Sequence, residues 1–219
     1  MMQVAIVGGT GAQGRGLAAR LAAAGVAVLV GSREAAHARE VVRALKEGHE
    51  GLSIEPATNE DAIARSDLVL LTVPFAHAAA ALQASRERFR SGSVLIDVTV
   101  PVAFEKGVPR LVEVPEGSAC EHLRRLLPEH VGMAAAFKTL PAATLATLDE
   151  PLDCDEFVCG DSPAARSRAL ELAAKIPGLR PVDSGELEAA RTIERMTVLA
   201  IGINKRYRIR SARFRVVGL

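Results

Sequence analysis

The amino-acid sequence predicts an α/β fold: a Rossmann-type, doubly wound, mostly parallel sheet with a C-terminal helix and a basic tail. Short β-branched runs alternate with Ala- and Leu-rich stretches, which is the order of a sheet wound with helices. The strand candidates are continuous apolar runs, as in strands that helices cover on both faces. A glycine-rich loop at residues 8–14 joins the first strand candidate to the first helix candidate.

Each element is predicted from its local pattern of apolar residues. Strands are expected at Gln3–Val7, Val26–Val30, Leu52–Glu55, Asp67–Val73, Ser93–Val98, Met133–Phe137, around Phe157–Val158 and at Leu179–Val182. Helices are expected at Ala12–Ala24, near Arg33–Lys46, from about Ala76, and at Ser118–Leu127, Ser162–Lys175 and Glu186–Ile203. No Ser- or Gly-rich linker divides the 219 residues. We expect a dinucleotide-binding domain at 1–143 and a smaller C-terminal part at 144–219, continuous with the first.

The charge balance and the cysteines restrict the expected partners and compartment. A net charge of +1 gives no overall attraction to nucleic acid or membranes, so neither is expected as a partner. No stretch is long and apolar enough for a membrane span, and the first apolar run is too short for a signal peptide. Three cysteines without CxxC spacing favour a reducing compartment. We therefore expect a cytoplasmic protein.

The glycine loop is the strongest motif in the chain. Gly9, Gly11 and Gly14 make a G-x-G-x-x-G spacing between a strand and a helix, the one context in which that spacing has a mechanism. The glycines permit a tight turn, close approach of the backbone to a pyrophosphate, and close packing of helix on strand. The helix N-terminus adds free N–H groups for the phosphates. The alternative is a glycine-rich turn without a ligand.

The end of the second strand favours NADP over NAD. NAD sites usually have Asp or Glu there, whereas this chain has Ser32 and Arg33. A serine hydroxyl and a planar guanidinium can both bind a 2′-phosphate. Glu34 weakens this argument because its carboxylate would repel the phosphate. In the alternative interpretation, Ser32 only caps the next helix and Arg33 is solvated.

Few residues in the chain are suited to acid–base chemistry. The five histidines and three cysteines show no metal-ligand spacing, and no metal site is expected. Hydride transfer between two bound cofactors needs aligned rings more than a protein acid or base. Val73 ends one strand candidate and Pro74 follows it, while Pro101 follows another, at the level where a nicotinamide would lie; simple strand termination is the alternative. The tail from Lys205 to Arg215 holds six cations and no acid, which suits a polyanionic ligand or a solvated surface.

An ordered series of motifs resembles the NADPH-dependent reductases of the deazaflavin coenzyme F420, and the likeness extends over nearly the whole chain. The series consists of Gly8–Gly14, Gly31–Arg33, Thr72–Pro74, Gly117–Ala119, Val158–Asp161 and Gly202–Tyr207. The resemblance implies a Rossmann-type fold, usually a homodimer, and NADP and coenzyme F420 as cofactors. It also implies reversible hydride transfer between C4 of the nicotinamide and C5 of the deazaflavin.

The resemblance also implies roles for individual residues. Those implied to bind the pyrophosphate are Thr10, Gly11, Ala12 and Gln13. Ser32 and Arg33 are implied to hold the 2′-phosphate, and Phe75, Ala79 and Ala142 to lie along the nicotinamide half. The segment from Ala136 to Ala142, which includes Leu140, resembles the lining of the deazaflavin pocket, and the tail would close that pocket with its cations toward the phosphate and glutamates of F420.

Two positions depart from the family pattern. Lys138 stands where members often have His, and we expect it to donate to the deazaflavin carbonyl or to stabilise charge near N1 as the catalytic residue. His37 stands where some members have Lys beside the 2′-phosphate, which predicts weaker or pH-sensitive NADP binding. An NADPH affinity that is flat between about pH 5.5 and 8 would exclude the pH effect.

Two other functions fit parts of the same pattern. An NADPH-dependent flavin or ferric reductase would keep the dinucleotide site and change the acceptor. A non-catalytic NADP-binding redox sensor would bind the cofactor without turnover. The sensor gives no reason for the motifs in the C-terminal half of the chain.

Overall fold

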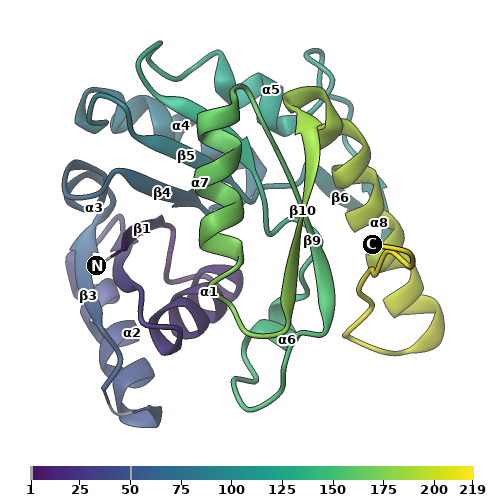
Figure 1. Cartoon of the computed structure of the whole chain (residues 1–219), viewed down its shortest axis with the longest axis horizontal. Helices are drawn as coiled ribbons and strands as arrows, with labels where there is room; N and C mark the ends of the chain where they lie inside the picture. The colour runs from purple at the N-terminus through teal and green to yellow at the C-terminus, as the bar shows by residue number, and fades with distance from the viewer. Residues whose placement is uncertain (1, 50) are drawn as a thin grey trace.

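The protein is described by a computed structural model that covers residues 2–49 and 51–219. Its centre is an eight-stranded sheet of order β10-β9-β8-β5-β4-β1-β2-β3 (Figure 1). The strands are β1 (Gln3–Val7), β2 (Ala27–Ser32), β3 (Ile54–Thr58), β4 (Leu68–Leu71), β5 (Val94–Asp97), β8 (Gly132–Ala135), β9 (Cys154–Gly160) and β10 (Leu179–Glu186). The mostly parallel Rossmann-type sheet predicted from the sequence is confirmed.

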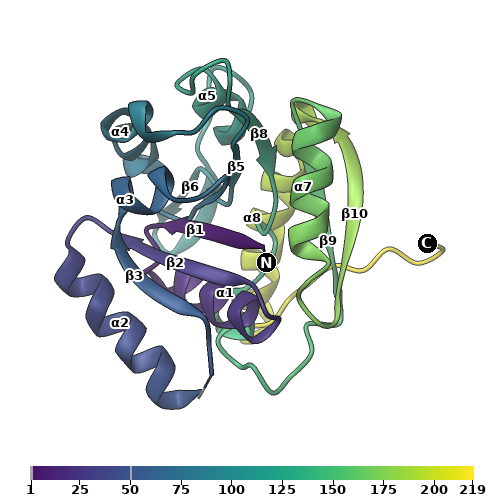
Figure 2. The same ribbon diagram turned by 60° about the vertical axis from the view of Figure 1, so that its left-hand side comes forward.

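Helices cover both faces of the sheet. They are α1 (Ala12–Ala23), α2 (Ala35–Gly48), α3 (Asn59–Ala64), α4 (Phe75–Ala84), α5 (Ala119–Arg124), α6 (Ala142–Leu145), α7 (Pro163–Ala173) and α8 (Ala190–Tyr207), with 3-10 turns η1 (Arg86–Arg88) and η2 (Leu187–Ala189). In Figure 2, α3 and α4 lie above β1 and β2, and α1 and α2 lie below them. None of the helices in the described residues is long and apolar enough to cross a membrane.

The two hydrophobic cores follow from the alternation of side chains along β1. Val4 and Ile6 join one buried cluster with side chains of α1, α2 and α7, while Ala5 and Val7 join a second cluster with α3, α4, α5 and α8. All four side chains are fully buried. Because both faces of each central strand are covered, the strands read as unbroken apolar runs in the sequence.

Strand order reverses between β1 and β4, and this arrangement positions the site. β1 pairs with β2 on one side and with β4 on the other, all parallel. The loops that leave β1 and β4 therefore separate to opposite sides and open a crevice at the carboxyl ends of the strands.

The C-terminal part adds two strands to the same sheet. β9 pairs antiparallel to β8 through Ala134 and Gly160, and β10 runs parallel to β9 across α7. The tail then returns along β9, where the amide of Asp155 donates to the carbonyl of Phe214 over 2.9 Å. Residues 144–219 thus share a sheet and a buried core with residues 1–143.

A β-hairpin was not predicted from the sequence. It consists of β6 (Val102–Glu105) and β7 (Val108–Leu111), an antiparallel pair outside the main sheet. Its turn places Lys106 at φ 48° and Gly107 at φ 76°, so both central residues have the positive φ of a type I′ turn. A Lys-Gly pair is a weaker signal for this turn than Asn-Gly or Asp-Gly.

Candidate active site

Two adjoining cavities lie at the carboxyl ends of the strands, at the reversal of strand order. The glycine-loop cavity, of about 860 Å³, lies between the glycine loop, the end of β2 and α4. The α8 cavity, of about 350 Å³, lies between the ends of β4 and β5, the segment 138–142 and α8. Thr72, Val73 and Pro74 line both, so the cavities meet above the end of β4.

The glycine loop has no room for side chains at two of its positions. A Cβ at Gly8, where φ is +74°, would meet Val73 Cγ1 at 2.4 Å, and a Cβ at Gly14 would meet the Cα of Gly9 at 2.6 Å. At Gly11 a Cβ would meet only the carbonyl of Gly8, at an ordinary 3.5 Å. Packing therefore requires glycine at positions 8 and 14, whereas the missing side chain at Gly11 leaves open space beside the N-terminus of α1. That space fits a pyrophosphate.

The corner beside β2 contains the groups predicted for a 2′-phosphate. Ser32 is nearly buried, and its Oγ accepts the amide N–H of Glu34 over 3.3 Å, which leaves its own proton free to donate. The exposed side chains of Arg33 and His37 line the same cavity. Arg33 makes no ion pair within the described part of the chain. Glu34 and Glu60 also line the cavity, so the corner holds both signs of charge.

Asn59 is a residue that the sequence reasoning missed. It begins α3, lines the glycine-loop cavity, and its Oδ1 accepts the amide N–H of Gly8 over 3.1 Å. A Cβ at Gly31 would meet the same oxygen at 2.8 Å. Asn59 therefore fastens the glycine loop to the end of β2. No helix was predicted at Asn59–Ala64, and the local sequence gave no signal of this contact.

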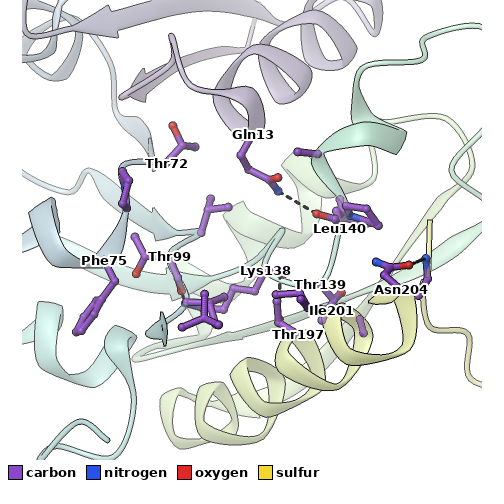
Figure 3. A pocket seen from close by; sticks show the side chains of 18 of the residues that line it. Gln13, Thr72, Phe75, Thr99, Lys138, Thr139, Leu140, Thr197, Ile201 and Asn204 are labelled. Atoms are coloured by element: carbon purple, nitrogen blue, oxygen red, sulfur yellow. Dashed lines mark hydrogen bonds between the residues drawn. The ribbon is translucent and has the colours of Figure 1, made fainter. Parts of the chain in front are cut away.

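Gln13 closes the α8 cavity on the α1 side. Its Nε2 donates to the carbonyls of Phe137 and Leu140, each over 3.2 Å, and so ties α1 to the segment after β8 (Figure 3). Phe137 holds a φ of +60°, the left-handed region. On the opposite side, the ring of Phe75 meets the ring of His122 edge to face at 6.0 Å.

Lys138 is among the residues that line the α8 cavity, but its ammonium is held in a buried cluster and does not reach the open space. Its side chain has no exposed surface, and Nζ donates to Asp97 Oδ2 over 2.6 Å, to Glu194 Oε1 over 3.2 Å and to the carbonyl of Thr99. All three N–H donors of the ammonium are thus used within the protein. Burial alone lowers the pKa of Lys138, but the two carboxylates outweigh burial and hold it above its ordinary value. This geometry does not support the expected donation from Lys138 to a bound deazaflavin.

The other predicted residues divide between the two cavities, with two exceptions. Thr10, Gly11, Ser32, Arg33 and His37 line the glycine-loop cavity; Gln13, Phe75, Leu140 and Ala142 line the α8 cavity; Val73 and Pro74 line both. Ala12 and Ala79 line neither. Ala12 is the first residue of α1, and Ala79 packs against the core beneath α4.

The basic tail is partly committed to contacts within the protein. Arg213 donates to the carbonyl of Leu152, and Arg215 pairs with Asp153 over 2.5 Å. The amide of Ala212 donates to Asn204 Oδ1 over 2.9 Å, which brings the tail back over the end of the α8 cavity (Figure 3). Arg206, Arg208 and Arg210 are exposed beside this fold-back.

Two cavities that meet above the reversal of a Rossmann sheet define a class of protein. One cavity begins at a glycine loop and a helix N-terminus, and the other offers a largely apolar wall beside it. This is the arrangement of a dinucleotide-binding oxidoreductase with its second site beside the nicotinamide end.

Comparison with known proteins identifies the family within this class. Residues 3–101 match the family model described as NADP oxidoreductase, coenzyme F420-dependent. The chain is 42% identical to an F420-dependent NADP reductase of Methanothermobacter thermautotrophicus, with 100% of this chain and 96% of the relative covered. It is 35% identical to the reductase of the same name from Methanocaldococcus jannaschii, covering 100% and 99%. The chain belongs to the family of F420-dependent NADP reductases.

A solved structure shows the same fold over the whole chain. It is a putative F420-dependent NADP reductase from Arthrobacter sp. FB24, with a TM-score of 0.84, 24% identity, and 99% of this chain and 100% of that chain covered.

Proposed function

We propose that the protein transfers a hydride reversibly between NADP(H) and the deazaflavin coenzyme F420. NADPH gives a hydride to C5 of the deazaflavin while one proton is taken up from solvent, which yields NADP⁺ and the reduced deazaflavin. The observation that carries the proposal is the junction of the two cavities at Thr72, Val73 and Pro74. Two flat rings that enter from the two cavities meet only there.

The residues of the chain bind and orient rather than exchange protons. The N-terminus of α1 and the open space at Gly11 receive the pyrophosphate, and Ser32, Arg33 and His37 receive the 2′-phosphate. Gln13 and Leu140 fix the wall against which the second ring rests. Hydride transfer between stacked rings depends mainly on such positioning.

We also propose a cytoplasmic homodimer. Its support is a set of exposed apolar side chains on the hairpin and on the outer face of α8, namely Phe104, Val108, Leu199 and Tyr207. Exposed apolar groups of this size commonly mark a protein interface. We expect light scattering to give twice the mass of 23.1 kDa, and Phe104→Glu to shift the protein toward the monomer. A monomeric wild type contradicts the dimer.

One assay tests the activity. The protein is mixed with NADPH and oxidised F420, and the visible absorbance of the deazaflavin is followed; FMN and ferric chelates replace F420 in parallel samples. Loss of absorbance with F420, and no comparable NADPH oxidation with the other acceptors, is the expected result. Turnover with FMN or ferric chelates alone identifies a flavin or ferric reductase. NADPH binding without turnover on any acceptor identifies a redox sensor.

A further inference from the structure

We propose that Lys138 and Glu194 are positioning residues, and that the buried Asp97–Lys138–Glu194 cluster sets the affinity for the second substrate by holding α8 against the sheet. This inference rests on the proposed function, because it takes the α8 cavity as the site of the deazaflavin. It replaces direct contact between Lys138 and that substrate with an indirect role.

The cluster joins three segments that are distant in the sequence. Asp97 ends β5, Lys138 follows β8, and Glu194 lies in the second turn of α8. Their side chains are 0%, 0% and 1% exposed. Glu194 Oε2 also accepts the amide N–H of Ala119 over 3.1 Å, at the start of α5. The ammonium of Lys138 therefore connects the sheet with the C-terminal helix, and the carboxylate of Glu194 connects that helix with α5.

The cluster also fixes the walls of the α8 cavity. Lys138 Nζ donates to the carbonyl of Thr99, and Asp97 Oδ1 accepts the amide N–H of Thr99 over 2.9 Å, so both backbone groups of this lining residue are held. Thr197, one turn after Glu194, donates its hydroxyl to the carbonyl of Lys138 over 3.0 Å.

The face of α8 that carries Glu194 continues into the cavity. Residues three and four apart share a helix face, so the face anchored at Glu194 extends through Thr197 and Ile201 to Asn204. These last three residues line the α8 cavity. A rotation or shift of α8 that breaks its contact with Lys138 would therefore move one whole wall of the cavity. The glycine-loop cavity contains no residue of α8 and would keep its shape.

The cluster contains two carboxylates and only one ammonium. Glu194 is therefore the position at which a substitution tests the cluster best. Burial raises the pKa of Glu194, Lys138 opposes that rise, and Asp97 adds to it. Two carboxylates thus share one ammonium in a site without exposed surface. Glu194→Gln removes one negative charge and keeps an oxygen that can accept from Ala119 or Lys138.

The test compares Glu194→Gln with Glu188→Gln, the same substitution at an exposed residue of the adjoining turn η2. Hydrogen exchange of the amides at 190–207 is measured without any cofactor, and KM for F420, KM for NADPH and kcat are then measured. For Glu194→Gln we expect faster exchange in α8 and a KM for F420 raised about tenfold, because misplacement of a binding wall by ~1 Å is enough for such losses. KM for NADPH should stay within about twofold, as should all values for Glu188→Gln.

Each other outcome overturns the inference. Unchanged exchange in α8, or an unchanged KM for F420, shows that the cluster does not set the wall. Equal losses for both substrates show general damage to the protein. If Glu194→Gln fails to fold, Thr197→Val, which removes the hydroxyl contacts with the carbonyls of Lys138 and Ile193, is judged by the same criteria. Failure of the wild type to reduce F420 overturns the proposed function instead, and the exchange data still decide whether the cluster holds α8.

Discussion

At the residue scale, we expect single side chains at the end of β2 to decide which dinucleotide the protein accepts. Arg33 is exposed, lines the glycine-loop cavity and can meet a phosphate as a planar fork. We expect Arg33→Ala to raise KM for NADPH roughly 10- to 100-fold, because a hydrogen bond to a charged group contributes about 1.5–3 kcal/mol. KM for NADH should change little. Arg39→Ala, an exposed substitution in the following helix α2 and outside the cavity, is the control; a parallel loss for NADH would contradict the assignment.

Two glycines of the loop are expected to have different roles. Gly14 is required by packing, and Gly11 leaves space for the bound cofactor. A methyl group at Gly14 meets Gly9 Cα at 2.6 Å, so Gly14→Ala should lower the free energy of unfolding by about 1–3 kcal/mol. At Gly11 the nearest atom is 3.5 Å away, so Gly11→Ala should leave stability within ~0.5 kcal/mol and weaken NADPH binding. Thermal unfolding and calorimetric titration with NADPH measure the two effects. Gly11→Ala that binds NADPH normally would show that the space at Gly11 receives no phosphate.

At the residue scale, the sequence predicted which residues of the glycine loop and of the end of β2 line the cavity. It did not predict where the side chain of Lys138 points. The glycine spacing and the missing acid at the end of β2 are local features with a known backbone geometry, so Gly11, Ser32 and Arg33 could be placed. The partners of Lys138 lie 41 and 56 residues away in the sequence. No local pattern indicates that two carboxylates from different elements surround one ammonium.

At the scale of elements, part of the C-terminal tail is bound to the rest of the protein, while some of its cationic side chains are exposed to solvent. Arg213 and Arg215 anchor it to the segment before β9, while Arg210 is exposed beside the fold-back at Asn204. We expect Arg210→Glu to raise KM for F420 several-fold at low salt and less at high salt, because exposed charges are screened. KM for NADPH should not change. Arg88→Glu, on the distant turn η1, is the control, and an effect independent of salt would contradict an electrostatic role.

Some helices and strands were predicted from the sequence and others were missed, and the difference follows from how each element is packed. β1, β4 and β5 are covered on both faces, and their apolar runs identified them. The hairpin β6–β7 is largely exposed and has no core-facing alternation to signal it. The predicted helix at 186–203 begins instead at Ala190 and ends at Tyr207, because Glu186 completes β10 in its pairing with Gly160.

At the scale of the whole molecule, one buried acid links stability to pH. Glu156 of β9 has no exposed surface, and its Oε1 accepts the amide N–H of Phe137 over 2.5 Å. Burial raises the pKa of Glu156 from 4.5 to about 8, against the opposing effects of the Phe137 amide and Lys138. Glu156 therefore stays protonated in the folded protein at pH values where the unfolded chain has released the proton.

The sign of the pH effect follows from this difference. Below pH 4.5 both states hold the proton; between 4.5 and about 8 only the folded state does, so the free energy of unfolding falls as pH rises. The slope from this group approaches about 1.4 kcal/mol per pH unit. Denaturant titrations from pH 5 to 8 should show that Glu156→Gln removes this slope, whereas Glu188→Gln keeps it. A slope that survives in Glu156→Gln would assign it to other groups.

The buried ammonium at position 138 also restricts which substitutions can accumulate in related proteins during evolution. A buried charge that loses its partner is far more costly than the neutral replacement of a whole set. Positions 97, 138 and 194 are therefore expected to change together when relatives diverge. A relative with a neutral side chain at the position of Lys138 should lack a carboxylate at the position of Asp97 or of Glu194, because a buried carboxylate would otherwise remain without its cation.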